Sequence, residues 1–331
     1  MTGYERTCAA IDFTGPDRIP MIADMLEPNF DGDVVAVYAK PIKSPEIAEN
    51  VDQWGCVWEH TDIDNMGMVK DILVKQVEDL SDITIPDPTD ARRYDRLAIV
   101  LERARRENKY VVYNGVKNDD TAIFERMHRL HGFAETLVDL ATNVKFMEKL
   151  ADMVLSYQIR QIEYVSRVFG SLIHGYRMAD DWGTQTGLMI SPKMWSGFFA
   201  LRYKVLFDKI HKAGWHVWMH SCGRINDILM PWKEVGLNVI NIQAPHMVGI
   251  AEAALLLRDT ICVETWCDIQ KTLTTGDKVK IETEVGEIID NWSTKRGGLI
   301  FRLINSTQAA QAGISEPATK IMAQAFYKLI A

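Results

Sequence analysis

Residues 215–224 read WHVWMHSCGR, an apolar and aromatic run that stops at a His, a Ser, a Cys and a Gly. The run predicts a strand, on which residues two apart point to the same side. His220 and Cys222 therefore present an imidazole and a thiol side by side, and Zn²⁺ accepts both nitrogen and sulfur donors. Gly223 lets the chain turn without a side chain over the pair. The alternative interpretation is a buried cysteine beside a hydrogen-bonded histidine, with no metal.

Strands and helices alternate on both sides of this segment. The expected strands cover residues 109–115, 171–181, 216–223, 238–245, 261–268 and 297–306. Apolar residues recur at helical spacing between them, which predicts helices. The expected helical segments are 122–168, 192–213, 225–236, 249–259, 278–292 and 317–329. Strands separated in this way indicate βαβ units and a parallel sheet.

The N-terminal part of the chain is less regular. Residues 4–12 predict a short helix, and the apolar segment at 18–26 predicts a first buried strand. Residues 30–44 mix Asp, Gly and Pro with apolar residues and allow no assignment. The aromatic stretch at 54–63 indicates a strand or a hairpin, and residues 90–108 predict a polar amphipathic helix.

The alternation favours a closed (β/α)₈ TIM barrel over a doubly wound sheet. A helix follows each later strand, and no GxGxxG fingerprint follows any strand. No composition break marks a linker. We expect an α/β protein with a single barrel domain over residues 1–331 and an N-terminal helical extension.

Composition limits the classes of partner. The net charge of −8 argues against nucleic acid and anionic membranes as partners. No apolar run approaches the roughly 18 residues of a membrane span, and the N-terminus lacks an export signal. The 5 cysteines are scattered and odd in number, which is typical of a reducing cytoplasm with free or metal-bound thiols. A homodimer is compatible with the sequence.

Active sites of this barrel lie at the carboxyl ends of the strands, so the polar residues there are expected to converge. These residues are Glu27 or Asp31, Tyr113, Asn114, Asp180, Asp181, His220, Cys222, Gln243, Cys267, Asp268, Asn305 and Ser306. Two ligands do not hold zinc, and Cys267 is the best-placed thiol for a third. A carboxylate or another histidine at the barrel mouth is the alternative.

The block DDWGTQ at residues 180–185 supplies two carboxylates. Neighbouring residues on a strand face opposite ways, so only one of Asp180 and Asp181 is expected in the pocket. That one serves as a general acid or a substrate anchor, and the alternative is a helix cap or a salt bridge. Tyr113, Asn114 and Tyr176 are candidates to line the same cavity. Aromatic residues near the strand ends, Trp182 among them, suit a flat substrate, with core packing as the alternative.

With these blocks the chain resembles the uroporphyrinogen decarboxylase superfamily, and in particular its corrinoid-dependent methyltransferase branch. The resemblance extends nearly from end to end, and DDWGTQ and HSCG are its most specific parts. The remaining blocks that carry it are AAIDFTGPDRIP, WGCVWE, IQAPHM and CDIQKTLTTG.

The resemblance implies an activity and a zinc site. Decarboxylases of the superfamily carry an Arg-Gln-Ala-Gly-Arg motif after the first strand, where this chain has MIADMLEPNFDGD, so porphyrinogen decarboxylation is not expected. Zinc methyltransferases of the branch use a His-x-Cys pair, here His220 and Cys222. Their third ligand is a Cys after the last strand, where this chain has LINSTQAA. This departure also argues against a thiol coenzyme as methyl acceptor.

We therefore expect a methyltransferase that moves a methyl group between a small methylated substrate and the cobalt of a cobalamin-type corrinoid on a partner protein. His220 and Cys222 are expected to hold Zn²⁺ with Cys267, and His220 and Asp181 to take part in catalysis. Tyr113, Asn114, Tyr176, Asp180 and Trp182 are expected to bind the substrate, for which a methoxylated aromatic compound is favoured. The alternatives are a decarboxylase and a non-catalytic corrinoid- or tetrapyrrole-binding protein.

Overall fold

The computed structural model describes residues 1–25, 28–43, 47–59, 67–117, 119, 121–304, 309–310 and 312–330. Within them, parallel strands close into a barrel in the order β1-β10-β9-β8-β7-β6-β5-β2. The barrel strands are β1 (Met21–Ile22), β2 (Val34–Ala39), β5 (Tyr110–Val116), β6 (Gly175–Ala179), β7 (His216–His220), β8 (Val239–Ile242), β9 (Cys262–Thr265) and β10 (Leu299–Arg302). The barrel predicted from the sequence is thereby confirmed.

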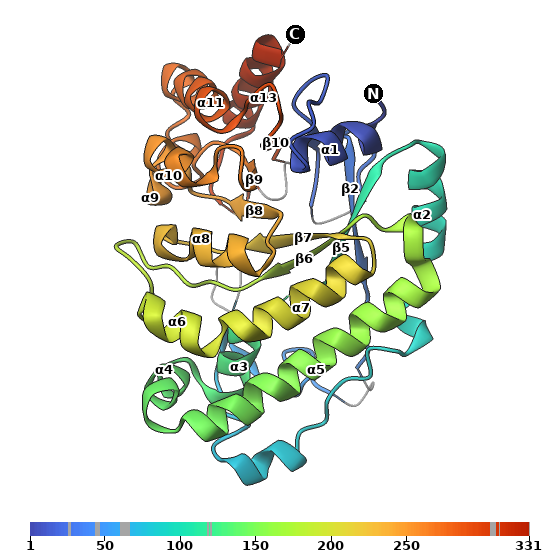
Figure 1. Ribbon diagram of the computed structural model, residues 1–331, viewed down its shortest axis with the longest axis vertical. Helices are drawn as coiled ribbons and strands as arrows, with labels where there is room; N and C mark the ends of the chain where they lie inside the picture. Colours follow the sequence, from blue (N-terminus) through green and yellow to red (C-terminus); the bar gives the residue numbers. More distant parts are fainter. Residues whose placement is uncertain are drawn as a thin grey trace.

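Helices surround the barrel (Figure 1). They are α1 (Gly3–Ile11), α2 (Leu97–Arg106), α3 (Phe124–His131), α4 (Phe133–Thr142), α5 (Val144–Phe169), α6 (Pro192–Phe198), α7 (Ala200–Lys212), α8 (Asn226–Val235), α9 (Pro245–Val248), α10 (Ile250–Leu257), α11 (Lys278–Trp292) and α13 (Glu316–Ile330). Short 3₁₀ turns lie at η1 (Val77–Ser81), η2 (Ala91–Tyr94), η3 (Gly170–Leu172) and η4 (Leu273–Thr275). Among the described residues, no helix is both long and apolar enough to cross a bilayer.

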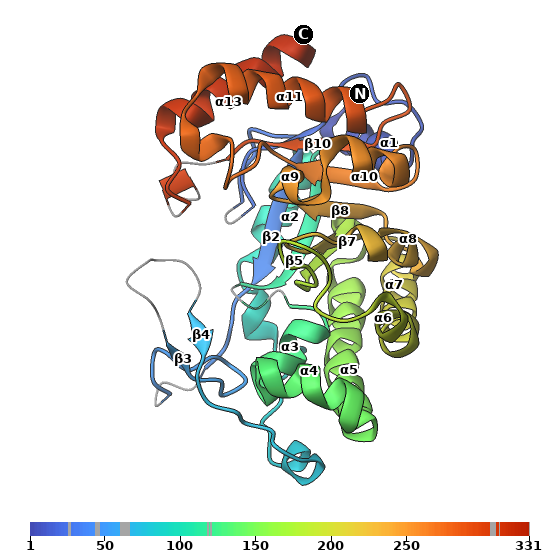
Figure 2. The same cartoon turned by 90° about the vertical axis from the view of Figure 1, so that its left-hand side faces the viewer.

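The structure adds detail to the sequence prediction in three segments, and in the second of them it agrees with the predicted strand or hairpin. The unassigned residues 30–44 contain β2, the second strand of the barrel. The stretch at 54–63 contributes β3 (Trp58–Glu59), which pairs antiparallel with β4 (Met68–Val69) in a hairpin separate from the barrel sheet (Figure 2). The helical interval at 122–168 contains three helices, because Gly132, with φ of +92°, separates α3 from α4, and Asn143 separates α4 from α5.

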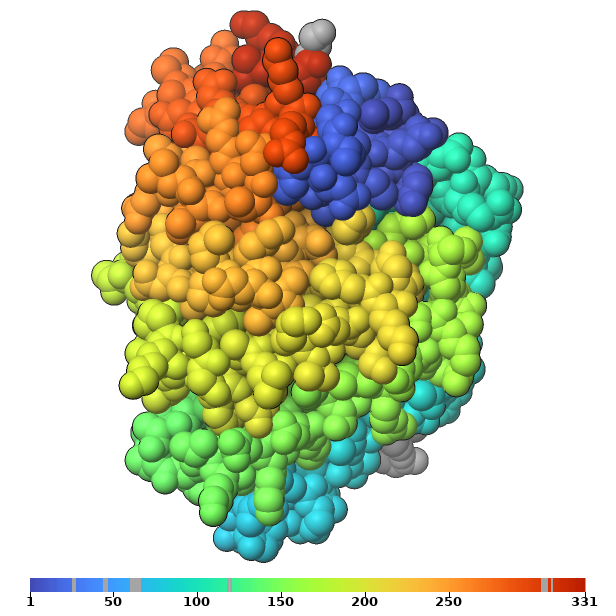
Figure 3. All heavy atoms as spheres, viewed as in Figure 1, coloured from blue at the N-terminus to red at the C-terminus, as the bar shows by residue number. Residues whose placement is uncertain are grey.

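Helix α1 closes the amino end of the barrel. Ile11 packs in one cluster with the inward-facing Ile22, Val34 and Ile300. The start of β2 is fixed by Asp33, whose carboxylate pairs with Arg6 of α1 at 2.5 Å and with Arg18 at 2.8 Å. This N-terminal segment lies beside the C-terminal part of the chain on the surface shown in Figure 3.

The barrel lumen changes from apolar to polar along its axis. Alternate strand residues face inward, and those near the amino ends of the strands form an apolar cluster that includes Val112, Trp218 and Val239. The next inward positions towards the carboxyl ends are polar and buried, namely Asn114, Arg177, His220, Asn241, Glu264 and Arg302. The fold therefore collects buried polar groups at the carboxyl end of the barrel.

The lumen is tightly packed near the amino ends of the strands, and a substitution at Gly175 tests this packing. A Cβ at this position would lie 2.7 Å from both the Trp218 Nε1 and the Tyr110 hydroxyl, which are hydrogen-bonded to each other at 3.2 Å. We expect Gly175→Ala to lower the free energy of unfolding by about 1–3 kcal/mol, since the added methyl separates these groups. Urea denaturation followed by fluorescence measures the change.

Gly286, in the middle of α11, is the matched control because a Cβ there meets no atom within 4 Å. Gly286→Ala should raise stability by about 0.5–1 kcal/mol, the usual gain from replacing a helical glycine. Equal stability of the two variants would contradict the tight packing of the lumen.

Candidate metal centre

Two loops that follow adjacent strands cross with their backbones in contact. The N–H of Gly183, after β6, donates to the carbonyl of Cys222, after β7, at 3.1 Å, and the N–H of Arg224 donates to the carbonyl of Thr184 at 2.8 Å. A Cβ at Gly183 would lie 2.6 Å from the Cys222 carbonyl oxygen, and one at Gly223 would lie 2.3 Å from Gly183. Gly223 also has φ of +79°. Only glycines allow this crossing without displacement of the backbone.

The crossing brings Asp181, His220 and Cys222 together. The Cys222 N–H donates to Asp181 Oδ1 at 2.8 Å, which fixes the carboxylate over the second loop. The His220 Nε2 lies 3.3 Å from Cys222 Sγ and 3.6 Å from Asp181 Oδ1. One donor atom from each residue lies within 4.8 Å of the other two. His220 is buried, Asp181 is half-buried and Cys222 is exposed, so the group can be reached from solvent.

The donor set and its spacing fit a zinc ion. Zinc bonds to nitrogen, oxygen and sulfur measure about 2.0–2.3 Å, which places the ligands of a tetrahedral ion roughly 3.5 Å apart. The observed separations of 3.3 and 3.6 Å are close to this value. Although Cys222 as a residue is exposed, the protein atoms around its thiol partly desolvate it, and this desolvation, followed by the nearby Asp181 carboxylate, raises the pKa of Cys222 far above its ordinary value. A cation between the two groups would reverse that preference and favour the thiolate.

Asp180 has a different role from Asp181. Its carboxylate accepts hydrogen bonds from the N–H groups of Ile123 and Phe124 at 2.9 Å and of Glu125 at 2.8 Å, and it contacts the Tyr203 hydroxyl. It is therefore a buried cap at the start of α3. Burial raises its pKa to about 6. Asp180 was expected to bind substrate, but its carboxylate is fully buried and is occupied by three backbone N–H groups and the Tyr203 hydroxyl, so the alternative role of a helix cap applies.

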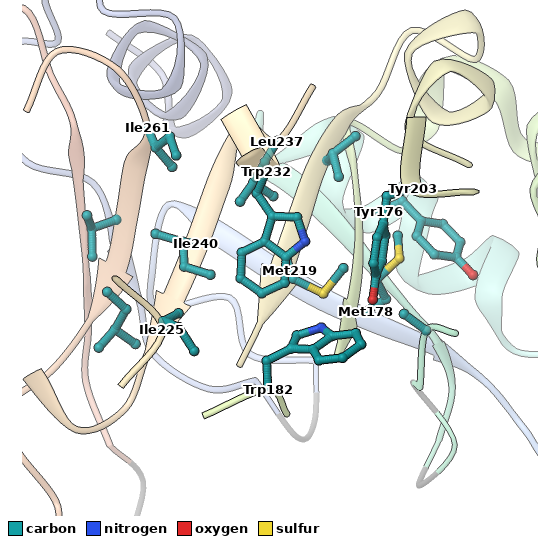
Figure 4. Packing of buried hydrophobic residues seen from close by; sticks show 14 of the residues in the cluster. Tyr176, Met178, Trp182, Tyr203, Met219, Ile225, Trp232, Leu237, Ile240 and Ile261 are labelled. Atoms are coloured by element: carbon teal, nitrogen blue, oxygen red, sulfur yellow. The ribbon is translucent and has the colours of Figure 1, made fainter. Parts of the chain in front are cut away.

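Tyr113, Tyr176 and Trp182 do not enter the lumen. Tyr113 packs against Tyr176 on the outer side of the sheet, and the Tyr176 hydroxyl donates to Gln158 of α5 at 3.0 Å. Trp182 is fully buried and stacks on Phe124 with ring centroids 4.3 Å apart. Figure 4 shows Tyr176 and Trp182 in this apolar layer with Met178, Met219 and Trp232. The structure thus contradicts the prediction that these three residues bind substrate.

The remaining predicted residues divide between the lumen and the wall. Asn114 faces the lumen, and its Nδ2 lies 3.4 Å from the carbonyl of Met25. Cys267 does not join the metal group. Its thiol is buried 3.8 Å from the carbonyl of Ile281 in α11, so it is enclosed by the helix layer. The third candidate ligand beside His220 and Cys222 is instead the carboxylate of Asp181. Three further predicted positions lie outside the described residues, namely Glu27, Asn305 and Ser306.

Two arginines in the lumen were missed by the sequence analysis. Arg177 of β6 and Arg302 of β10 are buried at inward-facing positions, 6% and 2% exposed. The segment after the first strand, MIADMLEPNFDGD, contains no cationic residue. A single arginine inside an apolar strand, as in GYRMA and LIFR, is the signal that identifies them.

Comparison with known proteins assigns the family. A sequence model of uroporphyrinogen decarboxylase (URO-D) matches residues 64–304. The chain belongs to the uroporphyrinogen decarboxylase family. The predicted family is therefore confirmed, although no curated protein matches the sequence significantly.

One solved structure supports the fold of this family member over its full length. A methyltransferase from Methanosarcina mazei superimposes with a TM-score of 0.72 at 12% identity and covers 100% of both chains. A D-psicose 3-epimerase gives a TM-score of 0.43 at 12% identity, and it covers 71% of this chain and 83% of that one. A 3-keto-D-glucoside 4-epimerase from E. coli gives a TM-score of 0.42 at 15% identity, with 72% and 86% covered. The first of these supports a barrel of the same fold over the full length.

The two neighbouring aspartates should respond differently to substitution. Asp180→Ala leaves three N–H groups at the start of α3 without their acceptor, so we expect a loss of about 3 kcal/mol in the free energy of unfolding. Asp181→Ala removes a half-buried side chain and should cost less than about 1 kcal/mol. Urea denaturation of the metal-free proteins gives both values. Similar losses in the two variants would contradict the division of roles.

Proposed function

We propose that this protein is a zinc methyltransferase that moves a methyl group between a small methyl ether and the cobalt of a corrinoid carried by a partner protein. The observation that carries the proposal is the convergence of Asp181, His220 and Cys222 at zinc-ligand spacing. Membership of the uroporphyrinogen decarboxylase family and the fold shared with an archaeal methyltransferase support it. Zinc bound there would supply a Lewis acid for the ether oxygen from which the methyl group departs.

The positions of the three side chains suggest from which sides the methyl donor and the methyl acceptor would approach the site. His220 is the last residue of β7 and faces the lumen, whereas Asp181 and Cys222 lie on the crossed loops nearer to solvent. In this proposal a donor on the lumen side and an acceptor on the solvent side would meet the three side chains from opposite directions. Separating donor and acceptor in this way keeps their reacting atoms aligned for direct transfer.

The class of donor follows from leaving-group chemistry. A corrinoid cobalt(I) on the partner protein would supply the nucleophile for the methyl carbon, and the ether oxygen would then leave with the bonding electron pair. A phenolate carries that charge over its ring and leaves more easily than an aliphatic alkoxide. We therefore favour an aryl methyl ether. The tryptophans near the strand ends do not contribute to this argument, because Trp54, Trp182 and Trp266 are at most 3% exposed.

A decarboxylase is the second candidate, and the two lumen arginines favour it. Arg177 and Arg302 offer a carboxylate substrate the cationic contacts that the sequence analysis did not find. A decarboxylase function, however, would not explain why Asp181, His220 and Cys222 lie at the spacing of zinc ligands. We therefore place methyl transfer first.

Metal content and methyl transfer test the proposal together. Wild-type protein should contain about one zinc ion per chain and should consume cob(I)alamin absorbance when supplied with an aryl methyl ether. His220→Ala, Cys222→Ser and Asp181→Asn should each lower zinc affinity and transfer rate by at least about 100-fold, since each removes a ligand.

Cys267→Ser is the matched control, because that thiol lies within the helix layer and should be dispensable for both properties. Transfer that survives the loss of His220 and Cys222 would refute the proposed site. Release of carbon dioxide from a carboxylate substrate, with no change in cobalt absorbance, would favour the decarboxylase.

A further inference from the structure

Helix α10 is apolar on every side, although only one side of it packs against the core. Its sequence, IAEAALLL, contains one charged residue, Glu252. The packed side consists of Ile250, Ala253, Ala254 and Leu257. On the opposite side Leu255 is 87% exposed and Leu256 is half-buried. A helix with apolar residues all round is normally enclosed on all sides, so the outer side of α10 is a surface that suits another protein chain.

The neighbouring helix α8 extends this apolar surface. Asn226 of α8 donates its Nδ2 to Glu252 Oε1 at 3.2 Å, so this side of α8 faces α10. Met230 lies one turn after Asn226 on the same side of α8 and is 36% exposed. Both helices follow adjacent parallel strands and therefore run in the same direction, which directs Met230 towards the turn of α10 that holds Leu255 and Leu256. We call Met230, Leu255 and Leu256 the α10 patch.

The charged residues on the two sides of Leu255 are of opposite sign. Glu252 lies three residues before Leu255 and Arg258 three residues after it, and both are exposed. The two bonds that the Glu252 carboxylate accepts, from Arg224 at 2.6 Å and from Asn226 at 3.2 Å, both end on Oε1. Within the described part of the chain, neither Glu252 Oε2 nor the Arg258 guanidinium takes part in a hydrogen bond or an ion pair. Each is therefore available to a second chain.

This order of charges is self-complementary. An α-helix rises about 1.5 Å per residue, so Glu252 and Arg258 lie about 4.5 Å on either side of Leu255 along the axis. If two copies of α10 pack antiparallel about a twofold axis at Leu255, Glu252 of each copy lies at the height of Arg258 of the other. Asp259 does not cancel Arg258, because its carboxylate accepts a bond from the Thr294 hydroxyl of its own chain at 3.0 Å. A twofold interface of this kind forms each favourable contact twice.

We propose that the outer side of α10 is an interface between two copies of this chain, with the two α10 helices antiparallel and Leu255 at the centre. Glu252 of each copy forms an ion pair with Arg258 of the other, and Met230 and Leu256 extend the apolar area on the α8 side. This surface belongs to the helix layer outside the barrel (Figure 1), so the dimer does not depend on the methyltransferase activity proposed above.

Sedimentation velocity of the purified full chain tests the apolar centre of the interface. Wild-type protein should sediment as a dimer at micromolar concentration. Leu255→Asp should raise the dissociation constant of the dimer at least about 100-fold, because it buries a charge without a partner. Leu201→Asp on α7 is the matched control, since Leu201 is also a strongly exposed leucine, at 73%, but lies outside the α10 patch. That variant should remain a dimer.

Charge reversal tests the antiparallel arrangement. Glu252→Arg and Arg258→Glu should each raise the dissociation constant by at least about tenfold, because each brings like charges together across the interface. An equimolar mixture of the two variants should form a heterodimer, since the copy with two basic residues then meets the copy with two acidic residues at both contacts. The double variant should form a homodimer again.

Three outcomes would overturn the proposal. A wild-type chain that stays monomeric at about 100 µM would leave the α10 patch to a different protein partner. A dimer that survives Leu255→Asp would place the interface on another surface. Single charge variants that dissociate but do not associate with each other on mixing would refute the pairing of Glu252 with Arg258. Far-UV circular dichroism of each variant distinguishes a loss of association from a loss of folding.

Discussion

The candidate site depends on the backbone contact between the loops that follow β6 and β7. Four segments of chain must meet there, namely two strand ends and two turns, and Gly183 and Gly223 allow the turns to touch. Hydrogen bonds then tie one loop to the other, from Gly183 to Cys222 and from Arg224 to Thr184. Because the loops are bonded to each other, the donor atoms that they carry are positioned before any ligand binds, and such preorganisation is what a metal site requires.

The alternation of a strand explains why two adjacent aspartates have unrelated roles. Asp180 continues the phase that faces the helix layer and receives the N–H groups at the start of α3. Asp181 takes the opposite phase and lies over Cys222. Capping α3 with Asp180 also anchors the strand end from which Asp181 projects. A structural residue thus holds a proposed metal ligand in place through the single peptide bond that joins them.

The sequence predicted the barrel well because the signal for it is distributed over many elements. Apolar runs and helical periods repeat through the last two-thirds of the chain, and an error in one does not change the fold. Asp and Gly residues directly precede the missed strand β2, so its apolar residues looked like part of a loop. The family resemblance pointed to the same architecture from different residues, and the family model agrees with it.

The candidate site was only partly predictable, because spacing fixes which residues share a face but not which face is the inner one. His220 and Cys222 lie on one side in either phase, and their association was correctly anticipated. To place Tyr113 and Tyr176 correctly, one must know which alternating residues of β5 and β6 face the lumen. In the structure both tyrosines face the helices. To place Cys267 correctly, one must know the direction in which the chain continues after β9. In the structure α11 covers the Cys267 thiol. Arg302 was overlooked because an arginine in a short apolar strand is rarely buried, and only the closed barrel makes its position interior.

The replacement of a thiol by Asp181 bears on the chemistry that we propose. A site with two thiolates and one imidazole suits soft partners and gives much electron density to the metal. A carboxylate is a harder ligand that donates less, so a zinc ion held by one imidazole, one thiolate and one carboxylate has a greater affinity for oxygen. An ether oxygen is the kind of ligand that benefits from this difference, whereas a thiol acceptor is not. The donor set of this chain is therefore better suited to removing a methyl group from oxygen than to delivering one to sulfur.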